Sequence, residues 1–343
     1  MPTISHKFAS LLLGLILSGS VLAADPAFNP AHPERYVVVK GDTLWDISSR
    51  FLRDPWRWPD VWFVNPQIAN PHLIYPGDTI VMTYLDGRPM LTLQRGSLVK
   101  LSPQVRSTPI DQAIPAIPLD AIKQFLTRPY VLDGEEISRA PYVVSFGTEH
   151  LRGASGLNAY IRAIENEDNQ SYEVVRPGGA YRDADTGELL GYEALFVGNA
   201  EIVRTGDPAT AVITENEMEM KVGDRLLPIT EGQPLETFYP KAPGSDIKGS
   251  IISILGGLDQ IGQFNVVVID RGADDGLQQG DVLAIDSKGA RIRDTVKGGK
   301  ARVTLPDEQA GMMLVFRVFP RVSFGLVMHA TRAMHVLDRV RNP

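Results

Sequence analysis

Short alternating runs of apolar residues follow one another after Pro141, and they limit the fold more than any other feature of the sequence. Period-two alternation bounded by Gly, Asp and Pro predicts strands separated by turns. The 31 glycines and 25 prolines of the chain also favour turn-rich β structure over long helices. We therefore expect residues 141–343 to be mainly β, with one short helix at 159–164. The predicted strands are YVVSF, SYEVV, EALFV, ATAVIT, NVVVID, DVLAID, MMLVFRVF and FGLVMHA.

Two segments of this β-rich region are similar to each other. Residues 211–228 align with residues 325–343 at an offset of 114 without a gap, and each copy follows a strand that ends near an arginine. A repeat of this kind predicts two related β units, with chance similarity between β-rich segments as the alternative. The pairs in register are Val212/Leu326, Ile213/Val327, Met220/Met334, Val222/Val336, Asp224/Asp338 and Arg225/Arg339.

The first 23 residues have the pattern of an export signal. Lys7 precedes an apolar run at residues 8–17, and Val21-Leu22-Ala23 fits the small-x-small cleavage rule. No later run approaches the roughly 18 apolar residues of a membrane-spanning helix. We therefore expect an exported, periplasmic protein without a transmembrane segment in its mature chain. Residues 24–35 are polar and proline-rich, which predicts a tether.

Several chemistries are excluded or disfavoured by composition and spacing. The chain has no cysteine, which excludes disulfides, thiolate metal ligands, cysteine nucleophiles and lipidation at the cleavage site. The net charge of −7 is spread along the chain without a basic run, so we expect no nucleic-acid partner. None of the six histidines stands in a zinc-peptidase motif, and His329 and His335 are expected to be a surface pair. In DADTGE (183–188) the glycine is fifth instead of sixth, which predicts a hairpin turn instead of a calcium loop.

We accordingly expect no catalytic residue, no cofactor and no metal. A catalytic glutamate of the transglycosylase type is the alternative that composition leaves open, and the β-rich pattern argues against those mainly helical domains.

All four tryptophans fall between positions 45 and 62, inside a compact unit near the N-terminus. Residues 36–39 predict a strand, and residues 43–52 predict a helix with Thr43 as its N-cap. Trp58-Pro59 begins a second helix, because proline is tolerated in the first helical turn. Residues 79–83 predict a closing strand, so the order is β-α-α-β.

Residues 85–140 predict a proline-rich connector with local structure. The run TPIDQAIPAIPLD suits no regular element, whereas residues 98–102 could form a strand and residues 119–126 a short helix. The predicted fold class is therefore α+β: a small βααβ module at 36–84, this connector, and a mainly β region of two related units.

The ordered residues of the N-terminal unit resemble those of the LysM family, whose modules bind the N-acetylglucosamine-containing glycans of peptidoglycan and chitin. The resemblance rests on the Gly-Asp-Thr-Leu turn, on Trp58, Val61 and Asn65 in the second helix, and on Leu-Ile-Tyr-Pro-Gly-Asp before the second strand. One departure is RFLRDPWR, which lengthens the connection between the helices.

The resemblance implies a glycan groove between the loop after the first strand and the loop before the second. Loop amides and carbonyls would reach the acetamido group, while Leu44, Leu73 and Ile74 would pack on the pyranose faces. The alternative is that Gly41-Asp42 is only a turn and Leu73 only core, since Gly-Asp occurs five times in the chain. The implied groove residues are Gly41, Asp42, Thr43, Leu44, Asn70, Pro71, His72, Leu73 and Ile74.

The tryptophans divide on the same pattern. Trp58 and Trp62 stand where the family fills its core, and Trp45 follows the groove turn and is expected to be partly buried beneath it. Trp56 lies in the departing segment, where it is either an exposed platform that stacks on sugar or plain packing at a helix end.

The whole arrangement resembles the TsaP family of type IV pilus secretin-associated proteins, whose C-terminal half is similar to a domain of flagellar outer-membrane ring proteins. Residues 266–285 and 314–340 carry this second, less specific resemblance. It implies a non-catalytic protein that holds an outer-membrane secretin to peptidoglycan, with many copies around a ring that bind one sacculus with avidity. The alternatives are a LysM-targeted wall enzyme and a peptidoglycan-bound scaffold without a link to pili.

Overall fold

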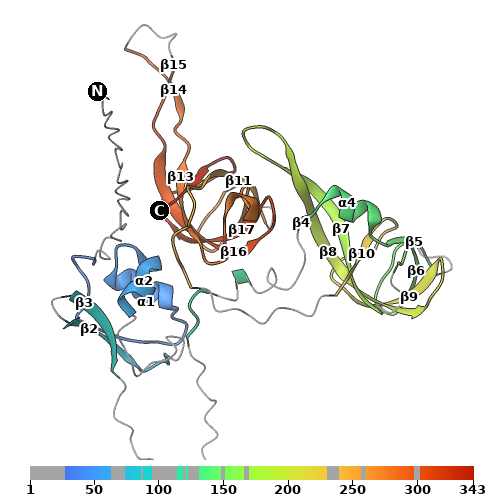
Figure 1. The fold of residues 1–343 in the computed structure, drawn as a ribbon, viewed down its shortest axis with the longest axis horizontal. Coiled ribbons are helices and arrows are strands. Elements are labelled where there is room, and N and C mark those ends of the chain that lie inside the picture. Colours follow the sequence, from blue (N-terminus) through green and yellow to red (C-terminus); the bar gives the residue numbers. More distant parts are fainter. Residues whose placement is uncertain are drawn as a thin grey trace, which may run out of the picture.

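The computed structural model describes residues 28–62, 74–85, 88–94, 114–118, 121–122, 131–147, 151–165, 170–229, 239–255, 260–296 and 302–343. Within these ranges the chain is mostly β with few helices, which agrees with a small α+β module followed by a β-rich region (Figure 1). No helix in the described ranges is long and apolar enough to cross a membrane. The predicted export signal and the predicted strand at 98–102 lie outside them.

The N-terminal module has the predicted β-α-α-β order. Its elements are β1 (Arg35–Val37), α1 (Leu44–Phe51), the 3-10 turn η1 (Pro55–Arg57), α2 (Trp58–Trp62) and β2 (Thr79–Leu85). The apolar faces of both helices and of the sheet share one core, because the spacing of their apolar residues places these on one side of each element. This core contains Leu44, Ile47, Phe51, Trp58, Val61, Trp62, Ile74 and Ile80.

The module extends beyond residue 84, where we predicted that the connector begins. Strand β3 (Arg88–Gln94) pairs antiparallel with β2 along its whole length and makes the third strand of a sheet in the order β1-β2-β3. Leu91 of β3 is buried in the module's core, so this strand, which we placed in the connector, packs with the module. The sequence does contain a signal that we missed: Asp86-Gly87 between two apolar runs is typical of a two-residue hairpin.

The predicted tether also contacts the module. Phe28 forms an isolated β-bridge with Leu52, and the amide of Asn29 donates to the carbonyl of Phe51 at 2.8 Å. Phe28 packs against the module's core, so the part of the expected tether that the structure describes contacts the module. Proline restricts the backbone of this segment, but one apolar side chain, that of Phe28, still packs against the module.

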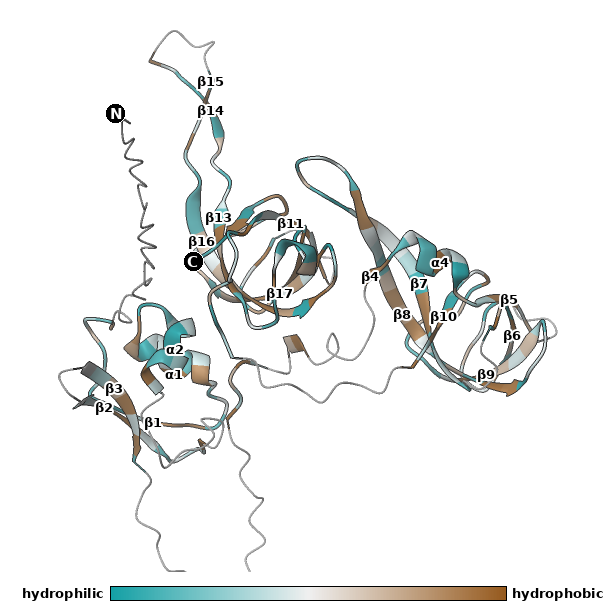
Figure 2. Cartoon of the chain, in the orientation of Figure 1, coloured by the Kyte–Doolittle hydropathy of each residue, from teal (hydrophilic) through white to brown (hydrophobic). Residues whose placement is uncertain are grey.

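The first β unit has seven strands, six of which form a closed ring that we call the first barrel. It runs in the order β8-β7-β10-β5-β6-β9, with the β8–β9 pairing closing it and β4 added beside β8. Helix α4 (Gly134–Arg139) has no buried residue and is hydrophilic in Figure 2. The strands are β4 (Val131–Leu132), β5 (Tyr142–Phe146), β6 (Asn158–Arg162), β7 (Ser171–Arg182), β8 (Leu189–Arg204), β9 (Ala209–Asn216) and β10 (Arg225–Pro228).

Strand β6 replaces the short helix that we predicted at 159–164. Ala159 and Ile161 are buried while Asn158 and Arg162 are exposed, so the burial alternates with a period of two. That alternation is the strand pattern, and it outweighs the helix propensity of the two alanines.

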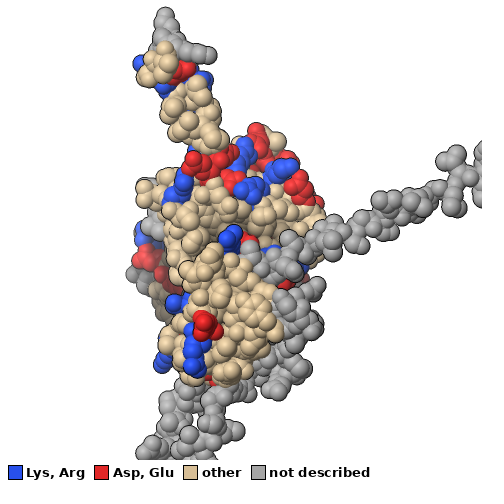
Figure 3. Space-filling view, turned by 90° about the vertical axis from the view of Figure 1, so that its left-hand side faces the viewer, with Lys and Arg blue, Asp and Glu red and all other residues tan. Residues whose placement is uncertain are grey.

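The second β unit is a closed barrel, the second barrel, with an attached hairpin. Its ring has the order β11-β12-β17-β16-β13-β18, and the two-stranded hairpin β14–β15, the arm, projects from it (Figures 1 and 3). A 3-10 turn, η2 (Ala273–Asp275), follows β12. The strands are β11 (Lys248–Ile254), β12 (Val266–Ile269), β13 (Val282–Ser287), β14 (Arg291–Arg293), β15 (Arg302–Thr304), β16 (Glu308–Val318), β17 (Ser323–Ala330) and β18 (Arg339–Arg341).

The two barrels have the same connectivity. Strands β5, β6, β7, β8, β9 and β10 occupy the same places in the first ring as β11, β12, β13, β16, β17 and β18 in the second. The residues that align in sequence also make the same contacts: Met220 bridges Gly153 in one barrel, and Met334 bridges Ile261 in the other. The two strands of the aligned segments are therefore equivalent in structure as well as in sequence.

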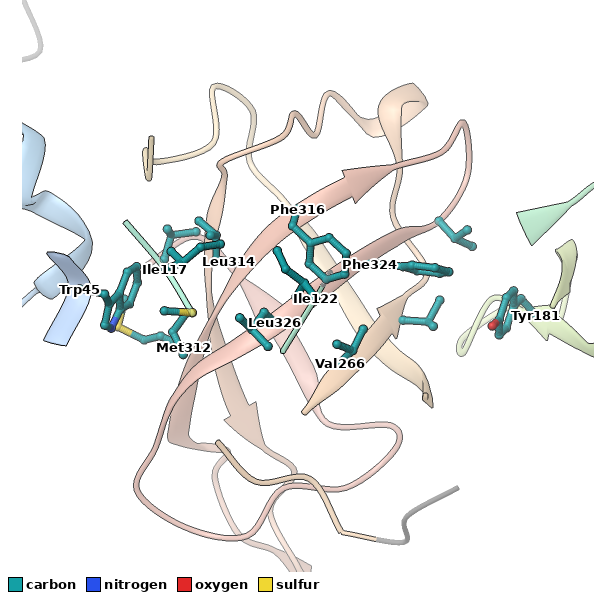
Figure 4. Packing of buried hydrophobic residues seen from close by; sticks show 14 residues of the cluster. Trp45, Ile117, Ile122, Tyr181, Val266, Met312, Leu314, Phe316, Phe324 and Leu326 are labelled. Carbon is teal, nitrogen blue, oxygen red and sulfur yellow. The ribbon is translucent and has the colours of Figure 1, made fainter. Parts of the chain in front are cut away.

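The three bodies meet at the second barrel. Trp45 of the module and Tyr181 of the first barrel both belong to a buried cluster that is made mainly by β12, β16 and β17, and they reach it from opposite sides (Figure 4). The turn at 183–188 docks there through ion pairs from Asp183 to Arg271 at 3.0 Å and from Asp185 to Arg339 at 2.8 Å.

Candidate glycan-binding groove

The first wall of the predicted groove is the turn between β1 and α1. The Asp42 carboxylate accepts hydrogen bonds from the Val39 amide at 2.9 Å and the Tyr36 hydroxyl at 3.0 Å. Burial, and then the hydrogen bond to Asp42, raise the pKa of Tyr36. Gly41 has a φ of +97°, which glycine adopts without strain. The side chain of Asp42 therefore holds the turn closed.

The same turn is found at five places among the residues that the structure describes. In each, an aspartate carboxylate accepts the amide hydrogen of the residue three positions earlier, at 2.7 to 3.0 Å. The residue before the aspartate has positive φ in every case, and it is glycine in four and Leu337 in the fifth. Four of the five Gly-Asp pairs in the sequence form this turn, so the pair by itself is no evidence for a sugar site. The aspartates are Asp42, Asp78, Asp224, Asp281 and Asp338.

The first turn of α1 supplies the amide groups on one side of the groove. Thr43 is the N-cap, as predicted: its hydroxyl accepts the Asp46 amide at 3.1 Å, and the Asp46 carboxylate accepts the Thr43 amide at 3.3 Å. This capping box satisfies two donors at the helix start. The amides of Leu44 and Trp45 have no partner within the helix, as is general for the first helical turn.

The second wall is the loop before β2, which the structure describes from Ile74 onward. The predicted sugar contacts Asn70, Pro71, His72 and Leu73 lie outside the described residues. Ile74 is buried in the module's core. The two walls are fixed to each other just after β1, since the Val38 amide donates to the Asp78 carbonyl and the Val38 carbonyl accepts from the Gly77 amide, both at 2.8 Å.

Residues 114–118 of the connector, the groove segment, lie between the two walls. The Leu44 amide donates to the Pro115 carbonyl at 3.0 Å, and the Trp45 amide donates to the Ala116 carbonyl at 3.2 Å. On the other side, the Ile114 amide donates to the Ile74 carbonyl at 2.8 Å. Leu44 and Ile74, which we expected to pack on a sugar, are 1% and 0% exposed in the structure and share their core with this segment.

The groove segment was not foreseen from the sequence, where it belonged to a connector without regular structure. Its apolar residues alternate with prolines, so no helix or strand period marks it as buried. The signal that could have found it is the concentration of Ile, Ala and Pro in a chain region that is otherwise polar.

Trp56 does not form the exposed platform that was one of its two predicted roles. Its ring is half-buried and packs against the cluster of the second barrel, with the Arg57 guanidinium 6.0 Å from the ring centroid. It borders a pocket of about 590 Å³ that Tyr239 and Lys241 also line. Trp58 and Trp62 fill the module's core as predicted, at 1% and 5% exposed.

The remaining motifs considered in the sequence analysis are the DADTGE turn and the pair His329 and His335. DADTGE makes the predicted turn between β7 and β8, closed by the Gly187 amide on the Asp183 carbonyl at 2.9 Å. His329 and His335 are exposed. Among the residues that the structure describes, no group of three or more His, Asp or Glu side chains is arranged to hold a metal ion.

A three-stranded sheet with two helices over one face and two Gly-Asp turns beside a groove defines a small α+β binding module. The LysM domain family matches residues 36–83, so this part of the chain is a LysM domain. The chain is also 38% identical over 58 residues to the uncharacterized protein YqbP of Bacillus subtilis (strain 168), a match that covers 14% of this chain and 26% of that protein. LysM is a binding module that is typical of cell-wall associated proteins, and its presence indicates peptidoglycan or related carbohydrate as the ligand.

Proposed function

We propose that this protein binds the N-acetylglucosamine-containing glycan of peptidoglycan through its LysM domain and does not cut it. The LysM match at residues 36–83 carries the proposal. A shallow groove of loop amides, carbonyls and aliphatic side chains suits a neutral sugar. The contacts would come from Gly41, Asp42, Thr43, Leu44, Asn70, Pro71, His72, Leu73 and Ile74.

The glycan-bound domain would anchor an envelope assembly in the periplasm, and a type IV pilus secretin is the partner we favour. The export-signal pattern and the resemblance of residues 266–285 and 314–340 to flagellar ring proteins support this. A single shallow site binds weakly, whereas several copies around a ring on one sacculus gain avidity through effective concentration.

The arm is the part of the second barrel that best suits a protein partner. Closure of a sheet into a barrel removes its edges, so a two-stranded hairpin outside the ring keeps backbone groups available for pairing. Residues 288–306 carry six Lys or Arg and one Asp on a chain of net charge −7. Ile292 and Val303 of the arm are each 46% exposed. This combination fits an acidic strand or loop on the partner.

Sedimentation with purified sacculi tests the glycan assignment. Residues 24–94 should sediment and residues 141–343 should not, and equal sedimentation of both would contradict the proposal. Release of muropeptides above a heat-inactivated control would identify a wall enzyme instead.

Crosslinking in cells followed by mass spectrometry tests the partner. We expect secretin peptides linked to residues of the arm, and loss of the protein should leave the secretin assembled but poorly anchored. Normal pilus-dependent twitching together with no secretin crosslink would favour a general envelope scaffold.

A further inference from the structure

The groove segment occupies the LysM groove in the manner of a ligand. Three hydrogen bonds hold it, from the amides of Leu44 and Trp45 to its carbonyls and from its Ile114 amide to the Ile74 carbonyl. All three join backbone atoms, so they depend on the path of the segment and not on the identity of its side chains. The groove's hydrogen-bonding groups are therefore occupied from both walls.

An acetamido sugar would need the same groups. The acetamido substituent of N-acetylglucosamine presents one carbonyl acceptor and one amide donor. The groove offers donors on the helix wall, at Leu44 and Trp45, and an acceptor on the loop wall, at the Ile74 carbonyl. The groove segment satisfies both walls with its own carbonyls and amide. These groups are already paired with the segment, and a buried donor or acceptor must be paired, so a sugar that used them would have to replace the segment.

The apolar contacts of the two occupants also coincide. Ile114 and Ala116 are buried against the core residues Leu44 and Ile74. These are two of the side chains that the family pattern assigns to the faces of the sugar ring. The segment therefore covers the apolar surface of the groove as well as its polar groups.

We propose that residues 114–118 are an intramolecular competitor that closes the LysM groove, and that glycan binds only when this segment leaves it. The inference rests on the proposed glycan-binding function and adds its regulation. Being part of the same chain, the segment competes at a high effective concentration that no dilution lowers. The apparent affinity for glycan falls in proportion to the open fraction, so a groove open in one molecule in ten binds about tenfold more weakly than a free groove.

The test compares three full-length proteins in sedimentation with purified sacculi. The release variant carries Ile114→Asp and Ala116→Asp. These substitutions put two charged side chains of the segment against the module's apolar core, which should drive the segment out of the groove. The control carries Val203→Asp and Val222→Asp, which add the same charge at two exposed positions of the first barrel, 59% and 61% exposed. We expect the release variant to reach half-maximal binding at about a tenth of the wild-type concentration and the control to match wild type.

Each outcome separates the two proposals. If wild type and a folded release variant bind equally, the groove is not closed by the segment and this inference fails while glycan binding stands. If neither binds, the proposed function fails and the inference with it. Folding of each variant is followed by tryptophan fluorescence, since every tryptophan lies in the module.

A second measurement needs no variant and decides the matter if the release variant does not fold. Amide hydrogen exchange of the wild-type chain is compared with and without an N-acetylglucosamine oligomer at saturation. We expect the Ile114 amide to lose protection while the Leu44 and Trp45 amides keep theirs, because sugar carbonyls replace those of the segment. An Ile114 amide that stays protected in the saturated complex would overturn the inference.

Discussion

Four tryptophans within one short stretch of sequence have three different roles. Trp58 and Trp62 are core residues of the module, and Trp45 turns away from that core to join the cluster of the second barrel. Trp56 packs at the edge of the same cluster and borders the pocket beside Tyr239. The family pattern predicted the two core residues, because their helical spacing is local. It did not predict the contacts of Trp45 and Trp56 with the second barrel, because these come from another part of the chain.

These roles predict an order of stability effects. Trp58→Ala and Trp62→Ala should each lower the free energy of unfolding of the module by about 3–5 kcal/mol, because a large cavity is left in a small core. Trp56→Ala should lower it by less, since its half-buried ring lies outside that core. Thermal melting followed by tryptophan fluorescence measures the loss of stability of the module within the chain, because all four tryptophans lie there. A loss at Trp56 as large as that at Trp58 would place Trp56 in the core.

The five aspartate turns predict a strained residue. Leu337 has a φ of +77°, where the equivalent residue in the other four turns is glycine. A leucine in this conformation costs roughly 1–2 kcal/mol, and glycine loses roughly 0.5–1 kcal/mol more backbone entropy on folding. Leu337 is 48% exposed, so its replacement removes little buried surface. Leu337→Gly should therefore stabilise the chain by about 0.5–1 kcal/mol.

Chemical denaturation followed by circular dichroism measures the effect of Leu337→Gly. Gly223→Leu, the reverse change in the equivalent turn of the first barrel, is the matched control and should destabilise. A Leu337→Gly chain that is less stable than wild type would show that this turn is not strained.

At the scale of elements, local pattern predicted most strands but not their partners. Each of the eight predicted runs overlaps one strand, because alternation is visible within each run. Strand β3 of the module was missed, and so were β4, β6, β10, β11, β14, β15 and β18 of the two β units. Closure of each ring depends on pairings such as β5–β10 and β11–β18 between segments far apart in the sequence. No local periodicity encodes such a choice of partner.

The groove was predicted only in part for the same reason. The positions of its walls follow from an ordered motif, and Thr43 caps the helix as the motif implies. Its occupant comes from the connector, where proline interrupts every period on which a prediction could rest.

The docked turn between β7 and β8 predicts a pH dependence. The backbone hydrogen bond from Thr186 is the main cause that lowers the pKa of Asp183 to about 2; burial opposes it, and the Arg271 guanidinium adds to it. A depressed pKa contributes stability that is present above the ordinary value of 3.8 and is lost as the pH falls through about 2. We expect the turn's contact with the second barrel to hold at pH 4 and to weaken between pH 4 and pH 2.

Carboxyl NMR of Asp183 checks this value directly. In Arg271→Gln the midpoint should rise but stay below the ordinary value, because the Thr186 hydrogen bond is the larger cause. A midpoint in that variant equal to the ordinary value would make the ion pair the dominant contact.

At the scale of the whole molecule, the connector joins the module to the second barrel. Ile114 and Ala116 belong to the module's core, whereas Ile117 and Ile122 belong to the cluster of the second barrel. The first barrel reaches the same cluster through Tyr181 and adds the ion pairs of its docked turn. One short stretch of connector therefore contacts both the candidate groove and the surface on which all three bodies meet.

This arrangement predicts that Ile122 controls how the bodies are held together. Ile122 is fully buried in the cluster, so Ile122→Asp should place a charge among apolar side chains and detach the module from the second barrel. The second barrel has a separate core on its other strand faces and should keep its β structure. We expect a larger radius of gyration by small-angle X-ray scattering and a red-shifted emission from Trp45. Leu305→Asp on the exposed arm is the control and should change neither. Unchanged scattering and emission in Ile122→Asp would mean that other contacts hold the module to the second barrel.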